Sequence, residues 1–106
     1  MPFTGDEDHS ITLEKAAQFT ENYRNSAGAA AFLGAFFGKA ALDHILSQDG
    51  CVGIRIYNAE KDNGDPNFVL VGVDASGNDL TEGEIAEWGS GCPPNCPPSS
   101  PLSGTA

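Results

Sequence analysis

Two short runs of apolar residues in the second half of the chain have the pattern of β-strands. Residues 51–57 alternate apolar and polar positions, residues 68–74 are apolar at almost every position, and both are rich in β-branched side chains. The connection of residues 58–67 is too short for a helical crossover, so the strands are predicted to pair antiparallel. Asn63-Gly64 is the expected tight turn between them. One face of the second strand carries Val69, Val71 and Val73.

Helical periodicity precedes these strands in two segments. The first helix is predicted over residues 13–25, where apolar side chains recur at helical spacing and Thr12 can act as the N-cap. We expect its aromatic pair, Phe19 and Tyr23, to lie in the core. The second helix is predicted over residues 39–48, and its apolar stripe is expected to cover the valine face of the strands.

Two further segments carry partial signals for helix. Residues 29–37 are rich in alanine, with Phe32 and Phe36 four positions apart, and they are predicted to form either a short helix or a buried apolar connector. Thr81 and Glu84 have the spacing of a capping box. A helix of one to two turns is therefore predicted after them, with its apolar side chains directed inward.

Together these elements predict one small α+β domain, with two to three helices packed on an antiparallel hairpin. The domain is expected to span residues 11–90, after a flexible acidic lead of residues 1–10. Residues 91–106 form a tail in which prolines exclude helix and central strand, so irregular polyproline structure is expected there. A chain of 106 residues is long enough for one modest core.

The charge balance limits the partners that this chain can take. Fifteen acidic residues against five basic ones give a formal net charge of -10. Such a charge argues against nucleic acid and against anionic membranes, and it favours a cationic protein partner or a metal ion. The N-terminus lacks the apolar stretch of a signal peptide, so a cytoplasmic location is expected by default, with export by another route left open.

The three cysteines are the main candidates for chemistry. Cys92 and Cys96 are separated by three residues, and a turn between them would bring their sulfurs together. Three alternatives then stay open: thiols that only pack, a disulfide, or ligands of zinc or iron. In the last case Cys51 and His44 are the candidate further ligands, although the spacing fits zinc sites only loosely.

The sequence does not contain the common catalytic motifs. It has no phosphate-binding glycine loop, no nucleophile elbow and no HExxH zinc motif, and neither histidine has a nucleophile close in sequence. We therefore expect a protein that is not an enzyme. The favoured expectation is a non-enzymatic interaction module that self-associates. The alternative is a thiol- or metal-binding protein, and a small enzyme of unknown class comes third.

Self-association is the function that the apolar pattern favours. An isolated two-stranded hairpin is marginally stable in water, and these strands carry little charge and no proline to protect their edges. A second copy is expected to cover them, in a closed oligomer or a filament. The competing expectation is a monomer completed by a third strand from residues 3–10 or from the tail. The expected contact residues are Phe32, Phe36, Tyr57, Phe68 and Leu70.

Four segments taken together resemble a group of small bacterial proteins of unknown activity. These segments are Phe37-Gly38-Lys39, Gly53-Ile54-Arg55-Ile56-Tyr57, Val71-Gly72-Val73-Asp74 and the cysteine- and proline-rich tail. The resemblance implies no activity, cofactor or site residue, so it adds nothing to the functional expectation.

Overall fold

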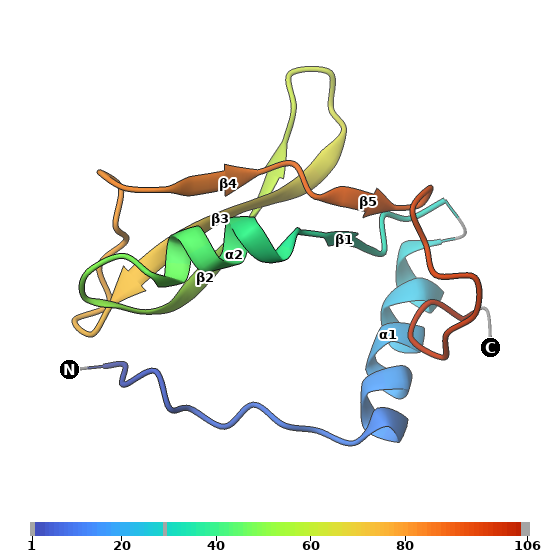
Figure 1. Cartoon of the computed structure of the whole chain (residues 1–106). Coiled ribbons are helices and arrows are strands. Elements are labelled where there is room, and N and C mark those ends of the chain that lie inside the picture. The colour runs from blue at the N-terminus through green and yellow to red at the C-terminus, as the bar shows by residue number, and fades with distance from the viewer. Residues whose placement is uncertain (1, 29, 105–106) are drawn as a thin grey trace.

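The computed structural model describes residues 2–28 and 30–104, which form two helices and two antiparallel sheets (Figure 1). The predicted α+β class is confirmed. In chain order the elements are α1 (Leu13–Ala27), β1 (Gly34–Phe36), α2 (Lys39–Leu46), β2 (Cys51–Glu60), β3 (Pro66–Asp74), β4 (Ile85–Glu87) and β5 (Ser90–Cys92). No helix within the described residues is both long and apolar enough to span a membrane.

The two predicted helices are present, with slightly different ends. The side chain of Thr12 caps α1 by accepting a hydrogen bond from the backbone N–H of Lys15 at 3.2 Å. The helix ends at Gly28, whose φ of 96° suits glycine. Helix α2 begins after Gly38 and ends at Leu46, two residues earlier than predicted.

Strands β2 and β3 form the long antiparallel hairpin that the sequence predicted. Ile54 lies opposite Gly72 and Ile56 lies opposite Leu70. The expected turn lies inside a longer connection, residues 61–65, which is closed by a hydrogen bond from the Lys61 N–H to the Asp65 carbonyl at 2.9 Å. This hairpin projects beyond the other elements (Figure 1).

Helix α2 covers the face of β3 opposite to the predicted one. A side chain at Gly72 would approach Ile45, Gln48 and Cys51, so Gly72 faces the helix and lets it come close. Val71 and Val73, its neighbours in the strand, point the other way. The prediction that the helices cover the valine face is therefore wrong. Four apolar side chains of the described residues are buried: Ile45, Leu70, Val71 and Val73.

The valine face is covered by loops instead of a helix. Arg55, which lies opposite Val71, forms an ion pair with Asp79 in the loop that follows β3. Its guanidinium lies 5.9 Å from the ring centroid of Phe3, and the Phe3 N–H donates to the carbonyl of Ala75 at 3.2 Å. The first residues of the chain thus pack against this face of the sheet.

The third strand of the main sheet is β4, where a short helix was predicted after Thr81. The capping-box geometry does not form, because the Glu84 N–H donates to the side-chain oxygen of Gln48 at 3.0 Å. The Gln48 side chain also occupies the space where a side chain at Gly83 would lie. Held in this way, the segment is extended and Ile85 pairs with Val71 of β3. The third strand therefore comes from neither residues 3–10 nor the tail.

The predicted helix over residues 29–37 is also absent from the residues described there. Gly34–Phe36 form β1, in which Ala35 lies opposite Gly91 of β5. The Leu33 N–H donates to the carbonyl of Cys92 at 2.7 Å and extends this pairing.

A buried asparagine joins the two sheets. Where β4 leaves β3, the Asn67 amide donates to the Gly89 carbonyl at 2.9 Å, and its oxygen accepts from the Gly89 N–H at 3.1 Å. The same oxygen accepts from the Phe68 N–H at 2.8 Å. Asn67 is only 4% exposed. Its side chain bonds the Gly89 backbone as a neighbouring strand would, directly after Trp88, which has a positive φ of 61°. The chain then continues into β5.

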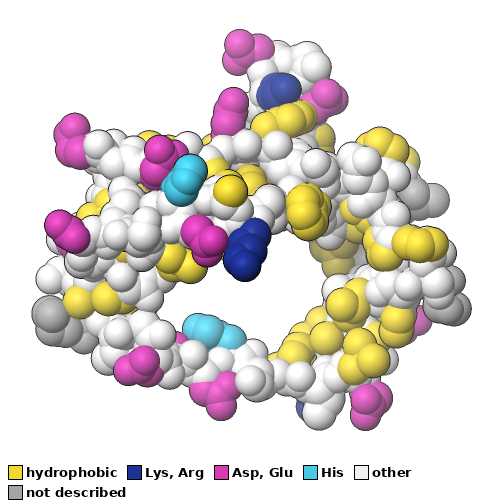
Figure 2. All heavy atoms as spheres, viewed as in Figure 1, with side chains coloured by type: hydrophobic (Ala, Val, Ile, Leu, Met, Phe, Trp, Pro, Cys, Tyr) yellow, Lys and Arg dark blue, Asp and Glu magenta, His cyan; other side chains and the backbone are white. Residues whose placement is uncertain are grey.

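The molecule is more open than a compact domain of this length. Residues 6–12 run as an extended arm from the edge of the main sheet to α1, which stands apart from the sheets (Figure 1). The radius of gyration is 15.4 Å, whereas a compact chain of this length has about 13 Å. The space-filling view in Figure 2 shows an open hole between this arm and the rest of the domain.

Candidate functional site

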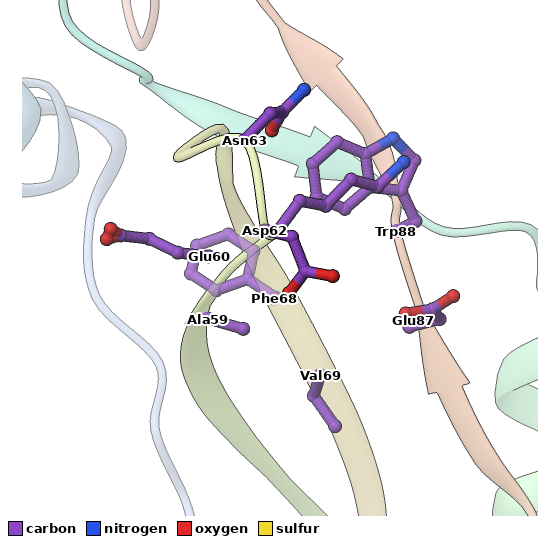
Figure 3. Close-up of a pocket in the computed structure, with 9 residues that line it drawn as sticks. Ala59, Glu60, Asp62, Asn63, Phe68, Val69, Glu87 and Trp88 are labelled. Carbon is purple, nitrogen blue, oxygen red and sulfur yellow. The ribbon is translucent and has the colours of Figure 1, made fainter.

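The tip of the β2–β3 hairpin and the end of β4 form a pocket of about 530 Å³ (Figure 3). Gly64, with a φ of 92°, lets the hairpin turn sharply, and this turn brings Lys61 over the ring of Trp88. The Lys61 ammonium lies 3.7 Å from the ring centroid. Such a contact between a cation and an aromatic face is attractive.

The lining of this pocket is acidic and partly apolar. Glu60, Asp62 and Glu87 contribute carboxylates to its lining, and Phe68 and Val69 contribute apolar surface. Figure 3 shows the Glu60 carboxylate directed away from the Trp88 ring. The lining contains no histidine or cysteine. In this structure Lys61 is the cation that the aromatic face holds.

The structure brings Cys92 and Cys96 together as a disulfide. Their Cα atoms are 4.6 Å apart, and the Asn95 N–H donates to the carbonyl of Gly91 at 2.8 Å to close the turn between them. Of the three alternatives, the structure shows the disulfide. In this state neither sulfur is a thiolate, so the pair cannot bind zinc or iron unless it is first reduced.

The other two predicted metal ligands lie away from this pair. Cys92 lies opposite Gly34, before α2 in the chain, whereas Cys51 opens β2 after α2 ends. The eight residues of α2, about 12 Å in length, therefore lie between them. The Cys51 thiol donates to the carbonyl of Gly53 at 3.2 Å, and His44 is exposed on α2. Among residues 2–28 and 30–104, no three His, Cys, Asp or Glu residues are grouped as metal ligands.

The five predicted contact residues have different environments. Phe36 is 66% exposed on β1, and Phe32 packs against Phe68 with ring centroids 5.5 Å apart. The Tyr57 hydroxyl donates to the carboxylate of Asp79, and this hydrogen bond raises the pKa of Tyr57. Leu70 is only 3% exposed in the core, so its prediction as a contact residue is wrong.

Helix α1 exposes apolar residues that the sequence pattern assigned to the core. None of the described residues of α1 is buried, and Phe19 and Tyr23 are 57% and 51% exposed. Leu13 and Ile11 are also more than half exposed. Figure 2 shows hydrophobic side chains gathered over this helix. The prediction that Phe19 and Tyr23 lie in the core is wrong, because more than half of each residue is exposed to water.

Comparisons of the chain with protein-family models, with curated proteins and with solved structures found no match.

Proposed function

We propose that this protein is a non-enzymatic module that self-associates, with the apolar face of α1 as part of the contact. The accessible surface supports this proposal. It amounts to 7326 Å², whereas a compact monomer of 11.0 kDa exposes about 5,600 Å². The excess of roughly 1,700 Å² is about twice the 800 Å² that each partner buries in a standard interface.

The position of the excess surface also favours a protein partner. Phe19 and Tyr23 lie four positions apart on α1, so their side chains are neighbours on one side of the helix. Leu13, at the start of the same helix, is also more than half exposed to water. Contiguous apolar surface of this kind marks interaction sites on soluble proteins.

Light scattering coupled to gel filtration at tens of micromolar tests the proposal. The wild-type chain is expected to elute as a dimer or a larger species, and Phe19→Asp is expected to lower its mass to that of one chain. Gln18→Asp is the matched control, because Gln18 is exposed and this substitution adds the same charge outside the apolar surface. A wild-type protein of about 11 kDa, without particles in electron micrographs, would overturn the proposal.

Binding of a cationic partner is a second candidate function, and the pocket beside Trp88 favours it. Because Lys61 occupies the aromatic face, Lys61→Met is expected to free it for a lysine-rich peptide. Trp88 is the only tryptophan, so its fluorescence follows the titration directly. Lys15→Met removes the same charge from α1 and serves as the control. An equal response of both variants to the peptide would refute a role for this pocket.

A further inference from the structure

Strand β2 lies at one edge of the main sheet, and among residues 2–28 and 30–104 no strand pairs with its outer side. Opposite residues of an antiparallel pair direct their N–H and C=O groups either toward each other or both away, in alternation along the strands. The Gly72 carbonyl accepts from the Leu80 N–H, so Gly72 points away from β2. Ile54 lies opposite Gly72 and therefore points outward too. By the same alternation the backbone groups of Ile54, Ile56 and Asn58 form the open edge of β2.

The N-terminal arm borders this open edge without pairing with it. A side chain at Gly5 would come within 2.9 Å of the Val52 carbonyl oxygen, so the arm touches β2 there. Next to this contact a groove of about 580 Å³ lies between the two segments. Glu7 and His9 line the groove from the arm, and residues 53–56 line it from β2. In Figure 1 the arm runs past the main sheet and joins none of its strands.

We propose that the open edge of β2 binds an extended peptide segment rich in lysine or arginine, which adds a strand to the main sheet. In strand addition the main-chain hydrogen bonds supply affinity, and the alternate side chains supply selectivity. Successive side chains of the bound segment would point to opposite faces of the sheet. Apolar side chains on one face would lie beside Ile56, which is 60% exposed, and basic ones on the other would face the arm.

The charges around the groove favour a cationic segment. Residues 6–8 give the arm three consecutive carboxylates. Backbone N–H groups, that of Thr4 first, lower the pKa of Glu7, so this carboxylate is ionised at neutral pH. Arg55 also lines the groove, but its guanidinium is already paired with Asp79. The formal net charge of -10 attracts a cationic partner over a longer range.

A second copy of the chain fits this edge less well than a peptide does. Two β2 edges paired antiparallel around Ile56 would place Glu60 of one copy opposite Val52 of the other. The hairpin tip, with Glu60 and Asp62, would then approach the acidic arm of the other copy. Like charges brought together across strands are destabilising. The groove between the arm and β2 also leaves room for one extended segment rather than for a folded domain.

Amide hydrogen exchange followed by NMR tests the proposal residue by residue. The probe is an end-blocked peptide of about seven residues that alternates lysine and valine, long enough to follow β2 past the groove. In the free protein the amides of Ile54, Ile56 and Asn58 should exchange fast, whereas those of Arg55 and Tyr57 should be protected by β3. Peptide at about ten times its Kd should slow the first three about tenfold and leave the other two unchanged. The same peptide with glutamate in place of lysine should have no effect.

Two variants with matched controls locate the contacts. Ile56→Pro removes an outward N–H and no bond to β3, a change that edge strands tolerate, and it should weaken peptide binding about tenfold. Ile56→Ala keeps the N–H and should weaken binding less. Glu7→Gln should weaken binding about two- to fivefold, the size of one exposed ion pair, whereas Glu14→Gln on α1 should leave it unchanged. Circular dichroism establishes that each variant is folded, and the Glu7 pair decides alone if the proline variant is not.

The outcomes separate this site from the other occupants. Binding of the lysine peptide with protection of Ile54, Ile56 and Asn58 supports strand addition. Binding without that protection, as at the pocket beside Trp88, overturns it, and so does absence of binding at millimolar peptide. Protection of the same amides that rises with protein concentration, without peptide, would assign the open edge to a second copy and overturn the peptide as its occupant.

Discussion

Replacement of Asn67 by alanine should destabilise the fold more than any change at an exposed polar residue. The substitution removes three hydrogen bonds, two to Gly89 and one to the Phe68 N–H. Gly89 is itself buried, so its N–H and carbonyl would be left without these partners away from water. Each hydrogen bond makes a net contribution of about 0.5–1.5 kcal/mol to the free energy of unfolding, and a buried polar group left unpaired costs about 1–3 kcal/mol.

The expected loss is about 2–4 kcal/mol, a large part of the 5–15 kcal/mol that is typical for a small domain. Urea unfolding followed by circular dichroism and by Trp88 fluorescence measures it, since Trp88 precedes Gly89. Asn58→Ala, on the exposed part of β2, is the matched control and should change stability by less than about 0.5 kcal/mol. Equal midpoints for the two variants would refute the view that Asn67 joins the sheets.

Three other outcomes follow from the structure. Val71→Asp places a charge at a position that is only 3% exposed, so the folded circular dichroism signal should be lost, and an unchanged melting temperature would contradict the packing. Backbone N–H groups, that of Asn78 first, lower the pKa of Asp74. The ionised Asp74 therefore stabilises the fold near neutral pH, and this contribution is lost as the pH falls through the lowered pKa. The urea midpoint of Asp74→Asn should accordingly change less with acid than that of the wild type. The metal hypothesis predicts about one zinc per chain after reduction of the disulfide and its loss in Cys96→Ser, whereas three titratable thiols in zinc-free protein would end it.

The parts of the fold that could be predicted are those with a local signal. Helix α1 has a capping threonine and apolar spacing within its own sequence, and β2 and β3 are long runs joined by a short turn. Each pattern is complete over ten or so residues, so it needs no distant partner to be recognised. The antiparallel hairpin follows directly from the length of its connection.

The short strands could not be predicted because distant residues create them. Strand β1 has three residues, and its partner β5 lies more than fifty positions away in the chain. Strand β4 carries a helix-start pattern, and the Gln48 side chain overrides it from the end of α2. Tertiary contacts of this kind outweigh local propensity, which is only a weak preference.

The candidate sites were only partly visible in the sequence. The spacing of Cys92 and Cys96 indicated that a turn could join them, but it could not distinguish a disulfide from a metal site. The pocket at Trp88 forms because β4 pairs with β3, so no local pattern could indicate that Lys61 lies over the Trp88 ring. Periodicity showed that Phe19 and Tyr23 share a side of α1, but it could not show that more than half of each residue stays exposed in the folded chain.

Stability and self-association should be linked in this protein. Only four apolar side chains of the described residues are buried, so the isolated chain has a small core. A partner that binds only the folded state adds stability that grows with protein concentration. The melting temperature of the wild type should therefore rise with concentration, whereas that of Phe19→Asp should stay constant. Gln18→Asp should follow the wild type, which separates loss of the apolar contact from added charge. A wild-type melting temperature that is constant across the range where light scattering shows dissociation would refute this linkage.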